Sequence, residues 1–86
     1  MAPFARNTGV TLIYKTDNWH SYASRDLIAT AYSLKDAINL CKEQADKESE
    51  TIDNDQLFNL NNIKQTQGYK GEGEFDIDEV EVNTLF

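Results

Sequence analysis

The sequence predicts a single small α+β domain: a three-stranded antiparallel sheet with one main helix packed on one face. Two strand-like segments stand close together at 10–15 and 25–32. A strongly amphipathic helical segment follows at about 34–48, and a third strand-like segment lies near the end of the chain. Because 86 residues can build only one core, the order strand, strand, helix, short helix, strand is most simply satisfied by two layers.

The first two strands should form a hairpin. The stretch VTLIYK alternates between a more apolar face and a less apolar face, and RDLIATAY follows after the turn-rich segment TDNWHSYAS. A connection this short makes the two strands antiparallel. The more apolar set is Val10, Leu12 and Tyr14. We therefore expect a second sheet face, carrying Ile13 and Ile28, with little cover.

The main helix has the clearest signals. Ser33 is its expected N-cap, with Asp36 three residues later in a capping-box arrangement. One apolar stripe follows the helical period and consists of Leu34, Ala37, Ile38, Cys41 and Ala45. Since Cys41 lies on this stripe, we expect it to be a small buried apolar residue rather than a reactive thiol.

Residues 49–72 are predicted to be a mobile connector that contains a short helix, and residues 1–8 an N-terminal arm. Asp53 or Asn54 is the expected cap of the short helix, and Leu57, Leu60 and Ile63 recur at three-residue spacing within it. The glycines at 68, 71 and 73 are typical of a flexible connection.

The last strand should begin near Gly73 and contain a β-bulge. Phe75 and Ile77 share one face, whereas Val80 and Val82 fall on the other. A bulge at the adjacent acids 78 and 79 would return both apolar pairs to one face.

The charge is distributed unevenly. Residues 1–48 contain six basic and six acidic side chains, whereas residues 49–86 contain nine acidic side chains and two lysines, so the second half carries the whole net charge of −7. Binding to a nucleic-acid backbone requires clustered Lys and Arg, so direct nucleic-acid binding is not expected. An acidic half favours a partner with a basic surface, or simply solubility.

The acidic side chains of GEGEFDIDEVEV form the leading candidate site. Glu72, Glu74, Asp76 and Asp78 share one strand parity, which spaces them roughly 6.6–6.8 Å apart. This spacing is similar to that of successive phosphates in an extended nucleic-acid strand, so the row could occupy a nucleic-acid-binding groove of a protein by mimicry. The alternative is a solvated sheet edge whose charges prevent aggregation.

The hairpin loop supplies a second candidate surface. Trp19 and Tyr22 are residue types that dominate protein–protein contacts. The alternative, which we favour for Trp19, is that its ring folds back to cap the small core. His20 is the only histidine and has no neighbouring catalytic motif, so a small enzyme using His20 is a distant alternative.

No cofactor motif or metal-ligand spacing is present, and no catalytic residues are expected. The lone Cys41 and the absence of an apolar run near the N-terminus favour a reducing, cytoplasmic location without membrane contact.

The segments VTLIYK, SRDLIATAYSLKDAINLCK and GEFDIDEVEVN resemble small uncharacterised proteins of phages and bacteria. In these proteins a hairpin leads into a helix and a closing strand carries an acidic EF-x-I-x-E pattern. The resemblance implies a fold and assigns no functional residues. The expected function is a non-enzymatic acidic protein-binding module, encoded by a phage or mobile element, that acts as an inhibitor by occupying a basic surface of its protein partner. The alternative is a structural domain that forms a homodimer through the uncovered sheet face.

Overall fold

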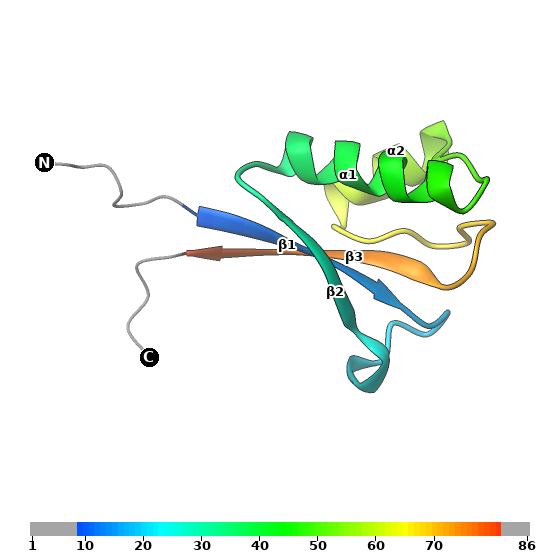
Figure 1. The fold of residues 1–86 in the computed structure, drawn as a ribbon, viewed down its shortest axis with the longest axis horizontal. Helices are drawn as coiled ribbons and strands as arrows, with labels where there is room; N and C mark the ends of the chain where they lie inside the picture. Colours follow the sequence, from blue (N-terminus) through cyan, green and yellow to red (C-terminus); the bar gives the residue numbers. More distant parts are fainter. Residues whose placement is uncertain (1–8, 82–86) are drawn as a thin grey trace, which may run out of the picture.

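A three-stranded antiparallel sheet forms one layer of the structure, and two helices form the other (Figure 1). The computed structural model describes residues 9–81. The sheet has the order β2-β1-β3 and consists of β1 (Gly9–Thr16), β2 (Asp26–Ala31) and β3 (Glu74–Glu81). The helices are α1 (Leu34–Lys47) and α2 (Asn54–Asn62), and a 3-10 turn, η1 (Tyr22–Ser24), lies in the β1–β2 loop. The predicted fold class is confirmed.

Both helices begin where the sequence places a cap. The Ser33 side chain accepts a hydrogen bond from the Asp36 backbone N–H at 3.1 Å, which starts α1. The Asp53 carboxylate accepts a hydrogen bond from the Gln56 backbone N–H at 3.0 Å, which starts α2. Each cap satisfies one of the backbone donors that a helix start leaves without a partner.

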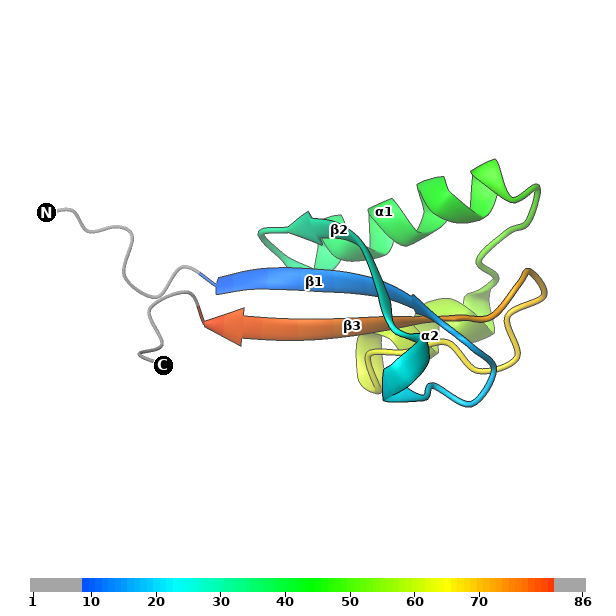
Figure 2. The ribbon, with the colours of Figure 1, turned by 60° about the horizontal axis from the view of Figure 1, so that its bottom comes forward.

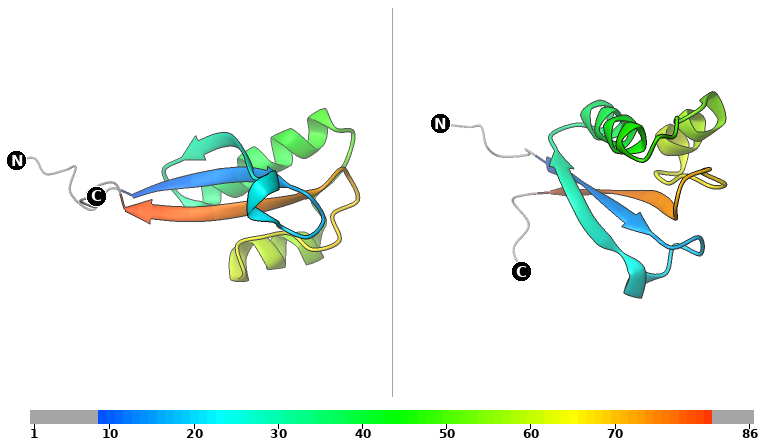
Figure 3. Two further views of the ribbon diagram at one scale, coloured as in Figure 1. Left: turned by 90° about the horizontal axis from the view of Figure 1, so that it is seen from below. Right: turned by 45° about the vertical axis from the view of Figure 1, so that its right-hand side comes forward.

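The face that the helices cover is the opposite of the predicted one. Ile13 is fully buried, and it lies directly opposite Ile77 of β3, which is also buried. Helices α1 and α2 lie on this side of the sheet, and the views in Figures 2 and 3 show neither of them on the other side. The core consists of Ile13, Ala31, Ala37, Ile38, Cys41, Ala45, Ile52, Leu60, Tyr69, Phe75 and Ile77.

Two features explain why the Ile13 face is buried although Val10, Leu12 and Tyr14 are more apolar. The α1 stripe contains Ala37, Cys41 and Ala45, whose short side chains let the helix approach the sheet closely around Ile13. Lys15 lies on the same face. Its ammonium sits 4.3 Å from the Phe75 ring centroid and 3.3 Å from Glu48 Oε1. A lysine can therefore cover an aromatic ring while its charge stays paired.

The predicted bulge in the last strand is wrong. β3 pairs with β1 in one uninterrupted register, from Gly9 opposite Glu81 to Thr16 opposite Glu74. The irregularity lies in β2 instead, where Ile28 is the extra residue between two regular pairs with β1. Val80 therefore lies opposite Val10, on the side away from the helices, and Val82 lies outside the described residues.

Part of the expected connector, residues 49–72, packs against the rest of the fold. Leu60, Thr66 and Tyr69 are buried. The strand-like segment 64–66 runs beside the outer edge of β3, with hydrogen bonds from Thr66 N to Phe75 O at 3.0 Å and from Ile77 N to Lys64 O at 2.8 Å. The expected N-terminal arm, residues 1–8, lies outside the described part of the chain.

Candidate partner-binding face

One face of the sheet is left without a covering layer by residues 9–81 (Figure 3). Residues directly opposite each other in antiparallel strands point to the same side, so the pairs with β1 define which side chains lie there. We call this surface the open face. Its members are Val10, Leu12, Tyr14, Leu27, Thr30, Asp76, Asp78 and Val80. It combines apolar side chains with two carboxylates.

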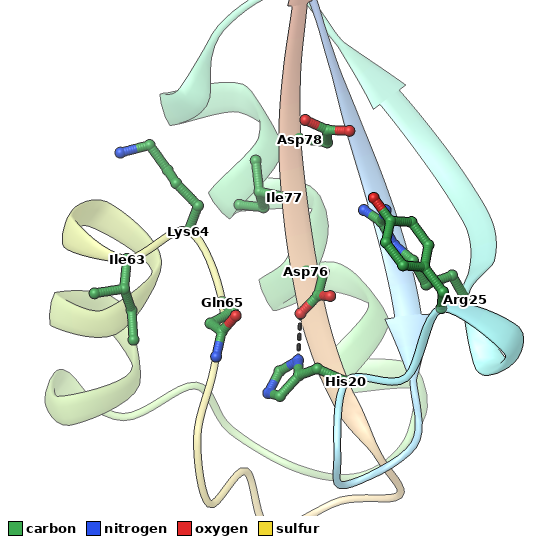
Figure 4. Close-up of a pocket in the computed structure, with 9 residues that line it drawn as sticks. His20, Arg25, Ile63, Lys64, Gln65, Asp76, Ile77 and Asp78 are labelled. Carbon is green, nitrogen blue, oxygen red and sulfur yellow. Dashed lines mark hydrogen bonds and ion pairs between the residues drawn. The ribbon is translucent and has the colours of Figure 1, made fainter.

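The β1–β2 loop reaches the open face at one end through a hydrogen-bond contact between His20 and Asp76. His20 Nδ1 contacts Asp76 Oδ1 (Figure 4), and both side chains are largely buried. The His20 backbone is left-handed, with φ of 55°, a conformation that costs free energy for a residue other than glycine. The pair therefore holds the loop against β3 in a conformation that it would not favour alone.

Asp17 fixes the same loop from its other side. Its carboxylate accepts hydrogen bonds from the backbone N–H groups of Ser21 and Trp19, at 3.1 and 3.0 Å, and from the Ser21 hydroxyl at 2.7 Å. Hydrogen bonding from the Ser21 backbone, followed by that from its hydroxyl, lowers the pKa of Asp17 below its ordinary value. The loop is thus fixed by two aspartates: Asp17 within the loop itself and Asp76 on β3.

A polar cavity of about 280 Å³ opens where the loop, β3 and the end of α2 meet (Figure 4). Arg25 lies in its wall, with the guanidinium carbon 3.9 Å from the Tyr14 ring centroid and 5.0 Å from that of Tyr22. His20 Nε2 and Arg25 Nε are buried and have no hydrogen-bond partner among the described residues. The cavity therefore offers polar groups and a stacked arginine at the end of the open face.

The predicted row of four carboxylates is not a row of exposed charges. Glu74 is only 5% exposed, and its carboxylate accepts hydrogen bonds from Thr66 Oγ1 at 2.7 Å, Gly68 N at 2.9 Å and Tyr69 N at 3.3 Å. A carboxylate that holds the 66–69 segment in this way is an internal structural group. Glu74 is therefore removed from the candidate contact residues.

The other three carboxylates have different surroundings. Asp78 is exposed on the open face, and Asp76 lies on the same face but is paired with His20. Glu72 is exposed in the loop before β3, where its backbone carbonyl accepts a hydrogen bond from Lys15. The structure brings Asp76 and Asp78 together and leaves Glu72 apart from them.

Both predicted aromatic contact residues are exposed. Trp19 is 82% exposed and Tyr22 is 84% exposed. The favoured expectation that Trp19 caps the core is wrong, because Tyr69 and Phe75 fill that end of the core with ring centroids 5.1 Å apart. Trp19 is thus available to a partner.

The pairing of His20 with Asp76 is not predictable from local patterns, because 56 residues separate them. The nearby serine hydroxyls are used elsewhere: Ser21 Oγ donates to Asp17 and Ser24 Oγ donates to the Ser21 carbonyl. Within residues 9–81, His20 contacts an aspartate but no nucleophile. This geometry indicates that the His20–Asp76 pair positions the β1–β2 loop against β3.

Among residues 9–81, no group of three or more His, Cys, Asp or Glu side chains is placed to hold a metal ion. Neither of the two helices in this range has the length and apolar character needed to cross a membrane. Comparisons with protein-family models, curated proteins and solved structures found no match to the chain.

Proposed function

We propose that the protein is a non-enzymatic binding module whose open face docks on a basic surface of a protein partner. The observation that carries this proposal is a group of half-buried and exposed apolar side chains on a sheet face that no helix or strand in residues 9–81 covers. A 51% exposed Leu27 lies beside Leu12 and Tyr14 on that face. Exposed apolar surface of this kind is typical of interaction sites.

The residues at one end of the face support contact with a protein. Tyr22 and Trp19 are exposed there, and Arg25 is held against the Tyr14 ring. Tyrosine, tryptophan and arginine contribute most of the binding energy in many protein interfaces. Because the loop is fixed by Asp17 and by the His20–Asp76 pair, little conformational entropy would be lost when it binds.

The charge of the molecule supports a basic partner. Asp78 is exposed on the open face, and residues 49–86 carry the full net charge of −7. The long-range field of such a chain accelerates encounter with a positive surface, and salt weakens that attraction. The partner would be occupied, and so blocked, in the manner of an inhibitor. The buried Cys41 thiol is compatible with a reducing cytoplasm.

Phosphate mimicry is not part of this proposal. The mimicry expected from the sequence required four exposed carboxylates in one row, and the burial of Glu74 interrupts that row. A homodimer through the open face is the competing account. A homodimer through this face would bring the Asp76 and Asp78 carboxylates of two copies together, whereas a basic partner is attracted to them.

The test is affinity capture from a cell lysate with three tagged proteins. These are the wild type, an open-face variant (Asp78→Asn) and a control (Glu79→Gln). Both side chains are exposed, and each variant loses one negative charge. We expect a basic partner that the wild type and the control retain, that the open-face variant loses and that added salt releases. A partner retained equally by the two variants would contradict the proposal.

A further inference from the structure

The two edges of the sheet differ in how they are covered. At β3 the segment 64–66 hydrogen-bonds to the outer edge around Phe75 and Ile77. At β2 the sheet simply ends, because β2 pairs only with β1 among residues 9–81 (Figure 1). An exposed strand edge presents unpaired N–H and C=O groups that can pair with another chain.

The residues of β2 do little to prevent such pairing. The strand has the sequence DLIATA, which contains no lysine or proline and has its one charge at the first position. The extra residue Ile28 bends the strand near its middle, so the regular part of the edge is Ala29–Ala31. Thr30 lies at the centre of this part and is exposed. Tyr32, just after the strand, is 80% exposed.

The side of α1 next to β2 carries a charge pattern that is complementary to itself when two copies run antiparallel. A shallow groove between them is lined by Ile28, Ala29, Leu40, Glu43, Gln44 and Lys47. Helical spacing places Asp36 on the same stripe as Leu40, Glu43 and Lys47. The stripe is acidic at its start and basic at its end, so two copies running antiparallel would bring opposite charges together.

The distribution of charge favours this half of the molecule for self-association. Both β2 and α1 lie within residues 1–48, whose acidic and basic side chains balance, whereas the excess negative charge belongs to residues 49–86. Two copies that meet through β2 and α1 would join the neutral halves and leave the acidic halves at the outer ends.

We propose that a second copy of this chain binds at the β2 edge, with the two β2 strands antiparallel about a two-fold axis near Thr30. The result is one six-stranded sheet with the α1 helices side by side on one face. A two-fold axis of this kind makes the interface self-complementary. In this register Ala29 of each copy lies opposite Ala31 of the other, so the regular part of the edge pairs without bulky or charged side chains facing each other. The two open faces point to the same side, so the dimer could bind a partner bivalently.

The test is the mass of the protein in solution by sedimentation equilibrium. The protomer mass is 9.8 kDa, so we expect about twice that value, falling on dilution. Thr30→Lys places two lysines opposite each other across the axis and should raise the dimer dissociation constant at least tenfold. Thr51→Lys, an exposed position away from β2, is the matched control and should leave the constant unchanged. Circular dichroism verifies that both variants fold.

A second variant keeps the proposal testable if Thr30→Lys does not fold. Thr30→Cys should form an intermolecular disulfide under mild oxidation, because opposed residues near a strand two-fold lie within disulfide reach. Thr51→Cys should not. A mass of one protomer at every concentration would overturn the proposal, as would a dimer that Thr30→Lys leaves intact. Neither result depends on a partner, so the proposed function would stand or fall separately.

Discussion

Glu74 and Thr66 form a buried hydrogen bond of 2.7 Å that joins β3 to the segment leading into it. Thr66 Oγ1 also accepts a hydrogen bond from the Phe75 backbone N–H at 2.9 Å, so this hydroxyl is bonded to two successive residues of β3. The Gly68 and Tyr69 N–H groups complete the coordination of the Glu74 carboxylate. An acidic residue that appears in the sequence as part of a surface row is therefore a structural centre of the fold.

Glu74→Gln should destabilise the protein. The amide keeps the size of the side chain but replaces one acceptor oxygen with a donor, so at least one buried N–H or hydroxyl loses its partner. Such a loss costs about 1–3 kcal/mol. Urea unfolding followed by circular dichroism measures the change. Glu79→Gln, at an exposed position of the same strand, is the control and should stay within about 0.5 kcal/mol of the wild type. Equal stability of the two variants would contradict the role of Glu74.

Stability should fall in acid, in part through Glu48. Burial raises the pKa of Glu48, but hydrogen bonds from Gln44 and Tyr69 and the charge of Lys15 outweigh it, so the pKa is lower than its ordinary value of 4.5. Because the folded pKa is depressed, the stabilisation is present above the unfolded pKa and is lost as pH falls through the folded pKa. Urea unfolding from pH 7 to pH 3 should therefore show a shallower decline for Glu48→Gln than for the wild type. Parallel curves would contradict this account.

Cys41 should be inert in the folded protein. Its side chain is fully buried, and burial raises the pKa of the thiol to about 12. The thiolate is the reactive form, so a disulfide reagent at pH 8 should modify Cys41 only when urea unfolds the chain. In Thr51→Cys the added thiol should react at once while Cys41 stays protected. Rapid modification of the wild type without denaturant would show that the α1 stripe is not packed as described.

Trp19→Ala should weaken partner binding without affecting the fold. The ring is mostly exposed, so its removal should change the free energy of unfolding by no more than about 0.5 kcal/mol. If the ring is an anchor, its loss should cost about 2 kcal/mol of binding free energy. Before binding, Trp19 fluorescence should be quenched readily by acrylamide, and a bound partner should protect it. Fluorescence that remains equally quenchable in the complex would place Trp19 outside the interface.

Local patterns were sufficient to predict the elements of this fold but not the faces of its sheet. Ser33, Asp53 and the stripe through Cys41 are signals contained within one turn or one helix, and the structure confirms them. The covered face was mispredicted because it depends on how closely α1 approaches Ile13, which β1 alone does not reveal. The predicted bulge is wrong because it requires Val80 to share a face with Phe75 and Ile77, whereas Val80 lies opposite Val10 on the open face.

The candidate site was only partly predictable for a related reason. Asp78, Trp19 and Tyr22 are exposed, as a contact site requires. The surroundings of Glu74 and of His20, in contrast, are set by residues that are distant in the sequence. Glu74 contacts a segment that appears flexible by composition, and His20 meets an aspartate 56 positions away. Contacts of this kind arise only when the chain is folded.

Asp78 and Glu79 provide the most direct test of the proposed function, because these neighbours on β3 are both exposed but point to opposite sides of the sheet. Titration calorimetry with the captured partner would compare Asp78→Asn with Glu79→Gln, which remove the same charge one residue apart. The open-face account predicts that Asp78→Asn weakens binding severalfold and reduces its salt dependence, while Glu79→Gln binds like the wild type. Equal affinities for the two variants, or a larger loss for Glu79→Gln, would contradict it.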